Sequence, residues 1–253
     1  MQVFVLGCVE GITEFLPISS TAHLILASQV MHIEQTEFMK SFEIIIQLGA
    51  ILAVVVLYWK QLLNIEIIKR LIVAFIPTGV LGFVFYKLIK QYLMDSSFVI
   101  LITLFLGGAF LVIFEWWYAE KVEVIDDIAC MSYKKCFFIG LFQSIAMVPG
   151  VSRSAATIVG GLLLGLKRKT IVEFSFLLAM PTMAAATGLD LIKNAQSFTL
   201  SEAHFLIFGF AVAFVMAILG IKFFLSYIQK HSFATFGVYR MIVAIVFLVL
   251  FLS

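Results

Sequence analysis

A chain of 253 residues of which 63% are hydrophobic and only 13% are charged cannot be an ordinary soluble domain. The mean hydropathy of +1.13 indicates an integral membrane protein, and the apolar runs are continuous rather than alternating, which favours helices over a β-barrel. The net charge of +2 decides little by itself. The sequence has no patch of basic and aromatic residues, so a nucleic acid is not expected as a partner. The three cysteines lack a CxxC spacing and are expected to be free thiols.

The chain begins with a short apolar segment, residues 2–15, which only Glu10 and Glu14 interrupt. Fourteen helical residues rise about 21 Å, which is less than the ~30 Å hydrocarbon core of a bilayer. Pro17 ends this segment, and a second short helix is expected at about 21–31. The hydroxyl residues that can cap the second helix are Ser19, Ser20 and Thr21. We therefore predict a re-entrant hairpin over residues 2–31, which is tolerated at membrane depth only where it is buried in protein or lines a polar cavity.

Three longer segments, each of which can span the membrane, follow this hairpin at about 42–59, 71–92 and 97–117. Residues 118–135 are the only extended polar stretch, and they are predicted to be a linker. A second hairpin at about 136–166 and spans at about 170–188, 204–226 and 234–252 complete the chain. The expected fold is an all-α integral membrane protein with a single membrane domain, about ten helices and six full spans.

The second half of the sequence repeats the first. With Gly7 placed on Gly140, an offset of 133 residues puts residues 18–22 on residues 151–155. Each half then contains one hairpin and three spans, so that residues 1–117 and 136–253 enter the membrane from opposite sides. Such an inverted-topology repeat is typical of transporters, in which the site lies at the midplane between the halves.

The positions of the basic residues predict the orientation. If successive loops alternate between two sides, the first side collects twelve basic residues: Lys60, Lys69, Arg70, Lys121, Lys134, Lys135, Lys167, Arg168, Lys169, Lys222, Lys230 and Arg240. The other side collects four: Lys40, Lys87, Lys90 and Lys193. Because basic residues favour the cytoplasmic side, the linker should be cytoplasmic and both termini and the active site should face the external side. Only Arg153 remains, at the tip of the second hairpin, where a cation should be paired.

Glu10 and Glu14 are four residues apart and therefore lie on one face of the first short helix. Two carboxylates inside a membrane need a metal, another cation or a proton between them, unless they pair for folding alone. His23 follows Ser20 by three residues on the second short helix, so the two share a face. Ser19 and the two hydroxyl residues after it could serve only as caps, but the N-terminus of a helix is also a site for anions.

The second hairpin repeats this geometry with different side chains. Gln143 stands where Glu10 stands, and Arg153 stands where Ser20 stands. The two tips together offer two helix N-termini, an acid and base cluster, and one guanidinium, which is the cation best suited to a phosphate. This set of groups favours a phosphorylated ligand whose apolar part lies in the lipid. The alternative for Arg153 is a simple ion pair with Glu14.

Two motifs carry a resemblance to a known family: EGITEFLPISSTAH at residues 10–23 and PGVSRSAATI at residues 149–158. They closely resemble the signatures of the bacterial undecaprenyl-diphosphate phosphatases of the bacitracin-resistance type, and FEIIIQLGAILAVV at residues 42–55 extends the likeness. The resemblance implies an enzyme of the bacterial inner membrane that recycles the lipid carrier for peptidoglycan synthesis. The residues that it implies to be catalytic are Glu10, Glu14, Ser20, His23 and Arg153. Those that it implies to surround the phosphate are Ser19, Thr21, Ser152 and Ser154.

The resemblance also implies a divalent cation, Mg²⁺ or Ca²⁺, for which Glu10 and Glu14 are the expected ligands. Ser20 is the first choice of nucleophile with His23 as its acid and base partner, and the alternatives are a phosphorylated His23 and a metal-bound water. A polyprenyl-phosphate flippase or transporter with the same site is the alternative function. Membrane lipids are the expected surroundings, and a homodimer is left open.

Overall fold

The computed structural model describes residues 1–34, 36–92, 97–119, 125–193 and 203–252. Within this part of the chain there are ten α-helices, two short 3₁₀ helices and no β-strand, apart from one isolated bridge between Ile125 and Leu166. The expected all-α membrane fold is confirmed. Residues 120–124 of the expected linker, Lys121 among them, lie outside the described residues.

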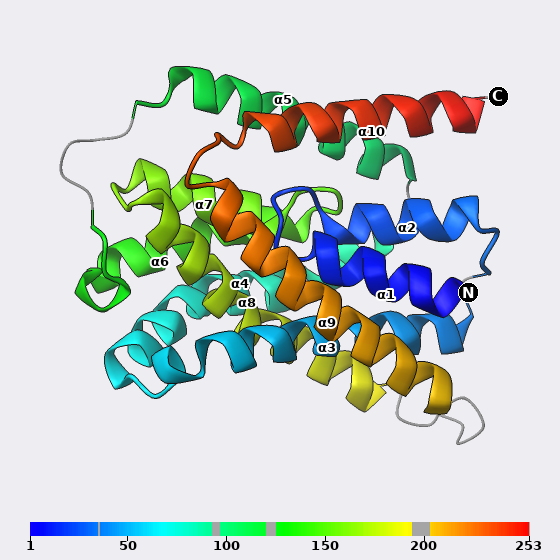
Figure 1. The fold of residues 1–253 in the computed structure, drawn as a ribbon, viewed down its shortest axis with the longest axis horizontal. Coiled ribbons are helices and arrows are strands. Elements are labelled where there is room, and N and C mark those ends of the chain that lie inside the picture. The colour runs from blue at the N-terminus through cyan, green and yellow to red at the C-terminus, as the bar shows by residue number, and fades with distance from the viewer. Residues whose placement is uncertain (35, 93–96, 120–124, 194–202, 253) are drawn as a thin grey trace.

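Both expected hairpins are present. The first consists of α1 (Gln2–Thr13) and α2 (Ser20–Val30), which lie side by side in Figure 1. The second consists of α6 (Tyr133–Ser144), a 3₁₀ turn at Ile145–Met147, and α7 (Arg153–Leu163). The first helix of each hairpin ends a few residues before a proline, Pro17 or Pro149, because proline cannot donate a backbone hydrogen bond and disfavours helical geometry in the residue before it.

Six longer helices surround the hairpins: α3 (Glu37–Leu62), α4 (Ile65–Tyr92), α5 (Ser97–Trp117), α8 (Arg168–Lys193), α9 (Ala203–Tyr227) and α10 (Ala234–Leu252). Five of them are long and apolar enough to cross a membrane. The sixth, α10, has 19 residues, which corresponds to about 28 Å, so it is the shortest of the six expected spans. The chain is therefore a multi-pass membrane protein.

The packing of the helices has a two-fold pattern. The helix α1 lies along α9, and its counterpart in the second half, α6, lies along α4; α5 lies beside α10 at the top of Figure 1. At the crossing of α5 and α10, a Cβ atom on Gly108 would lie 2.5 Å from the carbonyl oxygen of Gly237, and a Cβ atom on Gly237 would lie 2.5 Å from that of Gly108. An inverted repeat would produce such a reciprocal contact between equivalent glycines of the two halves. The division of the chain into two inverted repeats stays a prediction.

Small residues let α1 approach α9 closely. A Cβ atom on Gly11 would lie 2.5 Å from the carbonyl oxygen of Ala213, and one on Gly7 would lie 3.1 Å from that of Gly209. The two glycines are four residues apart and form a GxxxG face, the arrangement by which membrane helices pack backbone against backbone. This contact fixes α1, and with it Glu10, at a set depth beside α9.

The two ends of the molecule differ in what they carry. Both termini lie at one end together with the connection between α2 and α3, and the described part of the linker lies at the opposite end (Figure 1). The prediction for Arg240 is wrong: this residue is not at the linker end but is 1% exposed inside the protein, on α10. The charge count assigned Arg240 to the loop because it lies within the first two turns of the expected span. The helix α10 begins at Ala234 as expected, and Arg240 lies almost two turns inside it, where its guanidinium donates to buried carbonyl groups.

Candidate active site

The carboxylate of Glu14 is the centre of a buried polar cluster at the tips of the two hairpins. Its Oε2 atom accepts a hydrogen bond from the Ser20 hydroxyl, and its Oε1 atom lies 2.9 Å from a guanidinium nitrogen of Arg153. Glu14 belongs to the turn after α1, Ser20 opens α2 and Arg153 opens α7. The structure therefore joins a hydroxyl group, a carboxylate and a cation that lie up to 139 residues apart in the sequence.

Arg153 is held by several groups besides Glu14. One of its guanidinium nitrogens donates to the backbone carbonyl of Ser175 on α8 at 3.0 Å, and the guanidinium lies 6.0 Å from the centre of the Phe15 ring. Its side chain is 13% exposed. A cation so buried is costly unless it is paired, and here the pairing also keeps it beside the Ser20 hydroxyl.

The two hairpin tips are joined by a shared carbonyl group. The Ser154 hydroxyl donates to the backbone carbonyl of Leu16 at 2.7 Å, and the Ser152 hydroxyl lies 3.0 Å from that of Ser154. Ser152 also caps α7, because its hydroxyl accepts a hydrogen bond from the Ala155 amide at 3.2 Å. In this structure these two hydroxyls hold the tips together, and their part in binding phosphate stays a prediction.

Ser19 has the backbone conformation of a strained turn rather than that of a capping residue. Its φ angle is +71°, in the left-handed region that favours glycine, and its hydroxyl makes no capping hydrogen bond. Its carbonyl oxygen instead accepts from Nδ1 of His23 at 2.8 Å. The sequence predicted a side-chain cap at this position, but the residue contributes its carbonyl group to the site.

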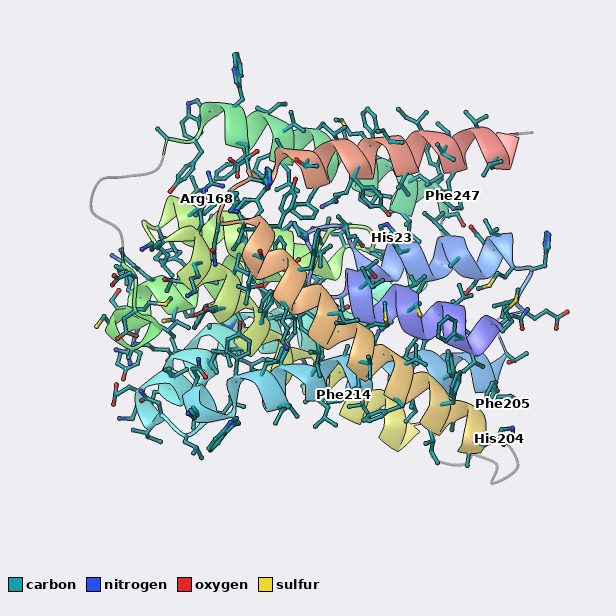
Figure 2. The ribbon with its side chains drawn as sticks, viewed as in Figure 1. His23, Arg168, His204, Phe205, Phe214 and Phe247 are labelled. Carbon is teal, nitrogen blue, oxygen red and sulfur yellow. The ribbon has the colours of Figure 1, made fainter. Side chains whose placement is uncertain are left out.

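His23 does not bind Ser20 in the structure. Its ring is hydrogen-bonded at Nδ1 to the Ser19 carbonyl and at Nε2 to the hydroxyl of Tyr239, 2.9 Å away. Figure 2 shows His23 near the start of α2, on the side that faces α10. The partner of the Ser20 hydroxyl is Glu14, so the expected pairing of Ser20 with His23 is not the one that the structure has.

Glu10 is 0% exposed, and neither of its carboxylate oxygens accepts a hydrogen bond. It interacts electrostatically with Glu14, Glu43 and Arg153. In the second hairpin, Gln143 takes the place of Glu10 and donates to the hydroxyls of Thr78 and Thr182. The Gln143 amide nitrogen therefore has two partners, whereas its Oε1 atom and both carboxylate oxygens of Glu10 are buried without a hydrogen-bond partner. Buried polar atoms are usually hydrogen-bonded, so the Glu10 carboxylate has free capacity to bind a further group.

Carboxylates with free lone pairs fit a hard cation such as Mg²⁺ or Ca²⁺. Within the described ranges, no group of three or more His, Cys, Asp or Glu side chains is placed to hold a metal ion by itself. Mg²⁺ is commonly held by one or two carboxylates together with phosphate oxygens of the substrate, and Glu10 with Glu14 supplies that number. The residues present therefore fit a cation that a phosphorylated ligand helps to bind.

An apolar cavity of about 560 Å³ leads from His23 toward the end of the molecule that carries both termini. It lies between α1, α2 and α10, and its polar lining residues are Thr13, His23 and Tyr239. The apolar ones include Phe4, Cys8, Val30 and Phe247; Figure 2 labels Phe247 beyond His23 on the same side of the molecule. The shape and lining suit a long hydrocarbon chain whose polar end lies at the hairpin tips.

Two residues of the site were missed in the sequence, and they are neighbours on α10. Tyr239 binds His23, and the guanidinium of Arg240 donates to the carbonyl groups of Pro17 at 3.3 Å and Gly150 at 3.0 Å, one in each hairpin turn. Nothing in their local pattern marks them, because a tyrosine followed by an arginine near a helix start reads as an interfacial anchor. Of the predicted site residues, Thr21 alone is exposed.

Comparison with known proteins places this geometry in a family. The family described as bacitracin resistance protein BacA matches residues 3–246. A protein of Aquifex aeolicus (strain VF5) named undecaprenyl-diphosphatase is 53% identical over 252 residues, which cover 99% of this chain and 98% of that protein. Proteins with the same name from Sulfurihydrogenibium sp. (strain YO3AOP1) and Persephonella marina (strain DSM 14350 / EX-H1) are each 53% identical, over 247 and 249 residues, and each match covers 98% of this chain and 97% of the relative.

Proposed function

The chain belongs to the bacitracin resistance protein BacA family, and from that membership and the geometry of the site we propose that it hydrolyses undecaprenyl diphosphate to undecaprenyl phosphate and inorganic phosphate. It is a membrane-embedded phosphatase that recycles the lipid carrier of peptidoglycan synthesis and thereby supports bacitracin resistance. The observation that carries the proposal is the Glu14 carboxylate held between the Ser20 hydroxyl and the Arg153 guanidinium. A flippase, the alternative from the sequence, is not favoured, since the relatives are named for a diphosphatase reaction.

In the proposed reaction, the Ser20 oxygen attacks the terminal phosphorus while Glu14 accepts the hydroxyl proton. The bond to the bridging oxygen breaks, and undecaprenyl phosphate leaves with the negative charge of that oxygen. Arg153 neutralises the charge that spreads over the phosphoryl oxygens. Water then attacks the phosphoserine, which releases inorganic phosphate and returns the proton to Ser20. The proposed base for Ser20 is Glu14 rather than the expected His23, because the Ser20 hydroxyl donates to the Glu14 carboxylate.

The second proposed component is a divalent cation bound by Glu10 and Glu14 with oxygens of the diphosphate. When bound, it would withdraw charge from the phosphoryl group that is attacked. Glu10→Gln tests it, because Gln143 shows that an amide is tolerated at the equivalent position. We expect the concentration of Mg²⁺ or Ca²⁺ that gives half-maximal activity to rise at least about tenfold in this variant, and an unchanged cation requirement would remove Glu10 as a ligand.

The apolar cavity is the proposed site of the polyprenyl chain near the diphosphate. Because this cavity leads toward the end that carries the termini, we propose that the termini and the active site face the external side of the inner membrane. Both hairpins that build the site belong to one polypeptide, so the reaction needs no homodimer.

The experiment that tests the proposed function is release of inorganic phosphate from undecaprenyl diphosphate by the purified protein in detergent, with Mg²⁺ or Ca²⁺ present. No gradient exists in detergent, so turnover would be hydrolysis and not transport. Arg153→Met should abolish most of the release, since the guanidinium neutralises charge that develops in the transition state. Absence of phosphate release by the wild-type protein would overturn the proposal.

A further inference from the structure

The imidazole of His23 is held from both sides, at each of its two nitrogen atoms. Nδ1 lies 2.8 Å from the carbonyl oxygen of Ser19, one turn before it in the same hairpin. Nε2 lies 2.9 Å from the hydroxyl of Tyr239, which is 216 residues away on α10. The two rings are nearly parallel, with 6° between their planes and 5.5 Å between their centres. Such a ring has no freedom to turn unless one of these contacts breaks.

The two contacts together fix which nitrogen carries the proton. A carbonyl oxygen can only accept, so Nδ1 must carry a hydrogen atom and donate it to Ser19. In neutral imidazole the lone pair is then on Nε2, and the Tyr239 hydroxyl must donate to it. A hydroxyl group can also accept, so the same contact persists if Nε2 becomes protonated.

The strained backbone of Ser19 supports this reading. A φ angle of +71° costs free energy in a residue with a side chain, and it persists only where the surrounding structure requires it. Here the strained residue is the one that supplies the carbonyl group to Nδ1. The residue with the strained backbone is therefore the same one whose carbonyl oxygen sets the tautomer of His23.

We propose that Tyr239 is a positioning residue, whose hydroxyl holds the Nε2 atom of His23 in place at the inner end of the lipid cavity. This inference rests on the proposed function, because it concerns how His23 serves the same reaction. Tyr239 also lines the cavity, so its hydroxyl lies where the polar end of the lipid should enter. In this arrangement α10 takes part in the site through Tyr239, although all the residues expected from the sequence lie on the hairpins.

Tyr239→Phe removes only the hydroxyl and keeps the ring that stacks on His23. Loss of one hydrogen bond that positions His23, a residue that the family resemblance implies to be catalytic, should lower kcat about five- to tenfold and leave KM for undecaprenyl diphosphate unchanged. Tyr118→Phe is the matched control, because the Tyr118 hydroxyl also donates a hydrogen bond, to the Leu162 carbonyl at 3.0 Å, at the far end of the molecule. This control should keep the wild-type kcat.

A double-mutant cycle with His23→Ala separates positioning from packing. If Tyr239 acts through His23, adding Tyr239→Phe to His23→Ala should change kcat by less than about twofold. An equal loss in both backgrounds, or no loss in the wild-type background, would overturn the proposal. A general effect on folding would lower the melting temperature of Tyr239→Phe, which thermal unfolding in detergent detects.

Nitrogen-15 NMR of histidine-labelled protein gives a result that does not depend on turnover. The resonance of the unprotonated Nε2 atom, assigned by its loss in His23→Ala, should move in Tyr239→Phe and stay in place in Tyr118→Phe. An unmoved resonance would contradict the proposal even if the protein hydrolyses the lipid. A protein that shows the shift but releases no phosphate would refute the proposed function and leave the hydrogen bond established.

Discussion

The two carboxylate oxygens of Glu14 have different partners, Ser20 at Oε2 and Arg153 at Oε1, and each contact fixes the position of that partner. The hydrogen bond to Oε2 orients the Ser20 hydroxyl, and the ion pair with Arg153 holds the carboxylate in place. In the proposed mechanism, the cation that stabilises the transition state thus also fixes the position of the base in the resting enzyme.

Ser20→Ala should lower kcat by roughly three orders of magnitude or more, because a covalent step has no substitute once its nucleophile is removed. Ser28→Ala is the matched control: Ser28 lies two turns further along α2, is also buried and is outside the site. Release of phosphate from undecaprenyl diphosphate is the measurement. If Ser20→Ala retained most of the wild-type rate, attack by water or by His23 would replace the serine mechanism.

The residues of the tips were predictable because their types are rare in an apolar chain, while their partners were not. Glu14, Ser20 and Arg153 stand out by polarity and by the repeat, and the structure brings them into contact. The contacts of Tyr239 and Arg240 depend on how α10 lies against the hairpins, and no local pattern encodes that placement. Sequence spacing also suggested a bond between Ser20 and His23, but the turn at Ser19 points the imidazole toward α10.

At the level of elements, the depth of α1 is set by its contact with α9. Gly11→Ala should destabilise the protein, because the added Cβ atom would lie 2.5 Å from the carbonyl oxygen of Ala213 and the two helices would have to separate. We expect a loss of about 1–3 kcal/mol, the usual cost of overpacking. Thermal unfolding in detergent measures the change.

Gly188→Ala provides the control for that experiment, since a Cβ atom on this helical glycine would meet nothing within 4 Å. It should leave the melting temperature unchanged or raise it slightly, because alanine favours helices. Equal melting temperatures for the two alanine variants would show that the contact between α1 and α9 is loose enough to accept an added Cβ atom, contrary to the close approach described.

If the cavity between α1, α2 and α10 holds the polyprenyl chain, filling it should weaken binding of long-chain diphosphates more than that of short-chain ones. Cys8→Phe should fill part of the cavity and raise KM for undecaprenyl diphosphate about tenfold, since displacing two methylene groups from an apolar site costs about 1.5 kcal/mol. The KM for farnesyl diphosphate, whose chain is much shorter, should change little. Val215→Phe, at an exposed position on α9, is the control for added bulk, and equal effects on both substrates would place the chain elsewhere.

For the whole molecule, Arg240 contacts both hairpin turns and α5, and so helps to hold the two halves together. Besides the two hairpin carbonyls, its guanidinium donates to the carbonyl groups of Thr103 and Leu104 on α5, each at 3.3 Å. Across the crossing of α5 and α10, Leu111 faces Gly237 as Arg240 faces Gly108. In the predicted repeat, leucine in one half corresponds to arginine in the other, and the arginine donates to carbonyl groups in three different parts of the fold.

Arg240→Leu places the counterpart residue at this position and should lower the melting temperature in detergent by roughly 5–10 °C, since several buried carbonyls lose their donor. Phosphate release should fall as well, because the two turns lose their common anchor. Arg240→Lys, which keeps the charge but has fewer donors, should recover part of the stability. The exposed Lys222→Leu is the control, and a melting temperature of Arg240→Leu equal to that of the control would contradict the role as an anchor.

Most of the fold was predictable from the sequence because hydropathy alone decides which segments can span. The six spans and two hairpins correspond to helices of the structure, with α3 and α4 extending beyond the expected ends, Glu37–Leu62 against 42–59 and Ile65–Tyr92 against 71–92. Polar residues at these ends, such as Lys60 and Glu66, interrupt the apolar run without interrupting the helix. Hydropathy therefore locates the membrane core, while the helix ends are set by backbone hydrogen bonds outside it.

The orientation of the molecule in the membrane is the remaining prediction. Without Arg240, and with Lys121 outside the described residues, ten basic residues of the first set remain at the linker end against four at the end with the termini, which predicts that the linker end is cytoplasmic. Cys130 is exposed at the linker end and serves as a natural reporter. In spheroplasts, a membrane-impermeant maleimide should leave Cys130 unlabelled and should label it after permeabilisation.

The variant Glu34→Cys, at the exposed opposite end and with Cys8 and Cys130 changed to serine, should be labelled in intact spheroplasts. The reverse pattern would place the active site on the cytoplasmic side, and the enzyme would then act on lipid in the inner leaflet.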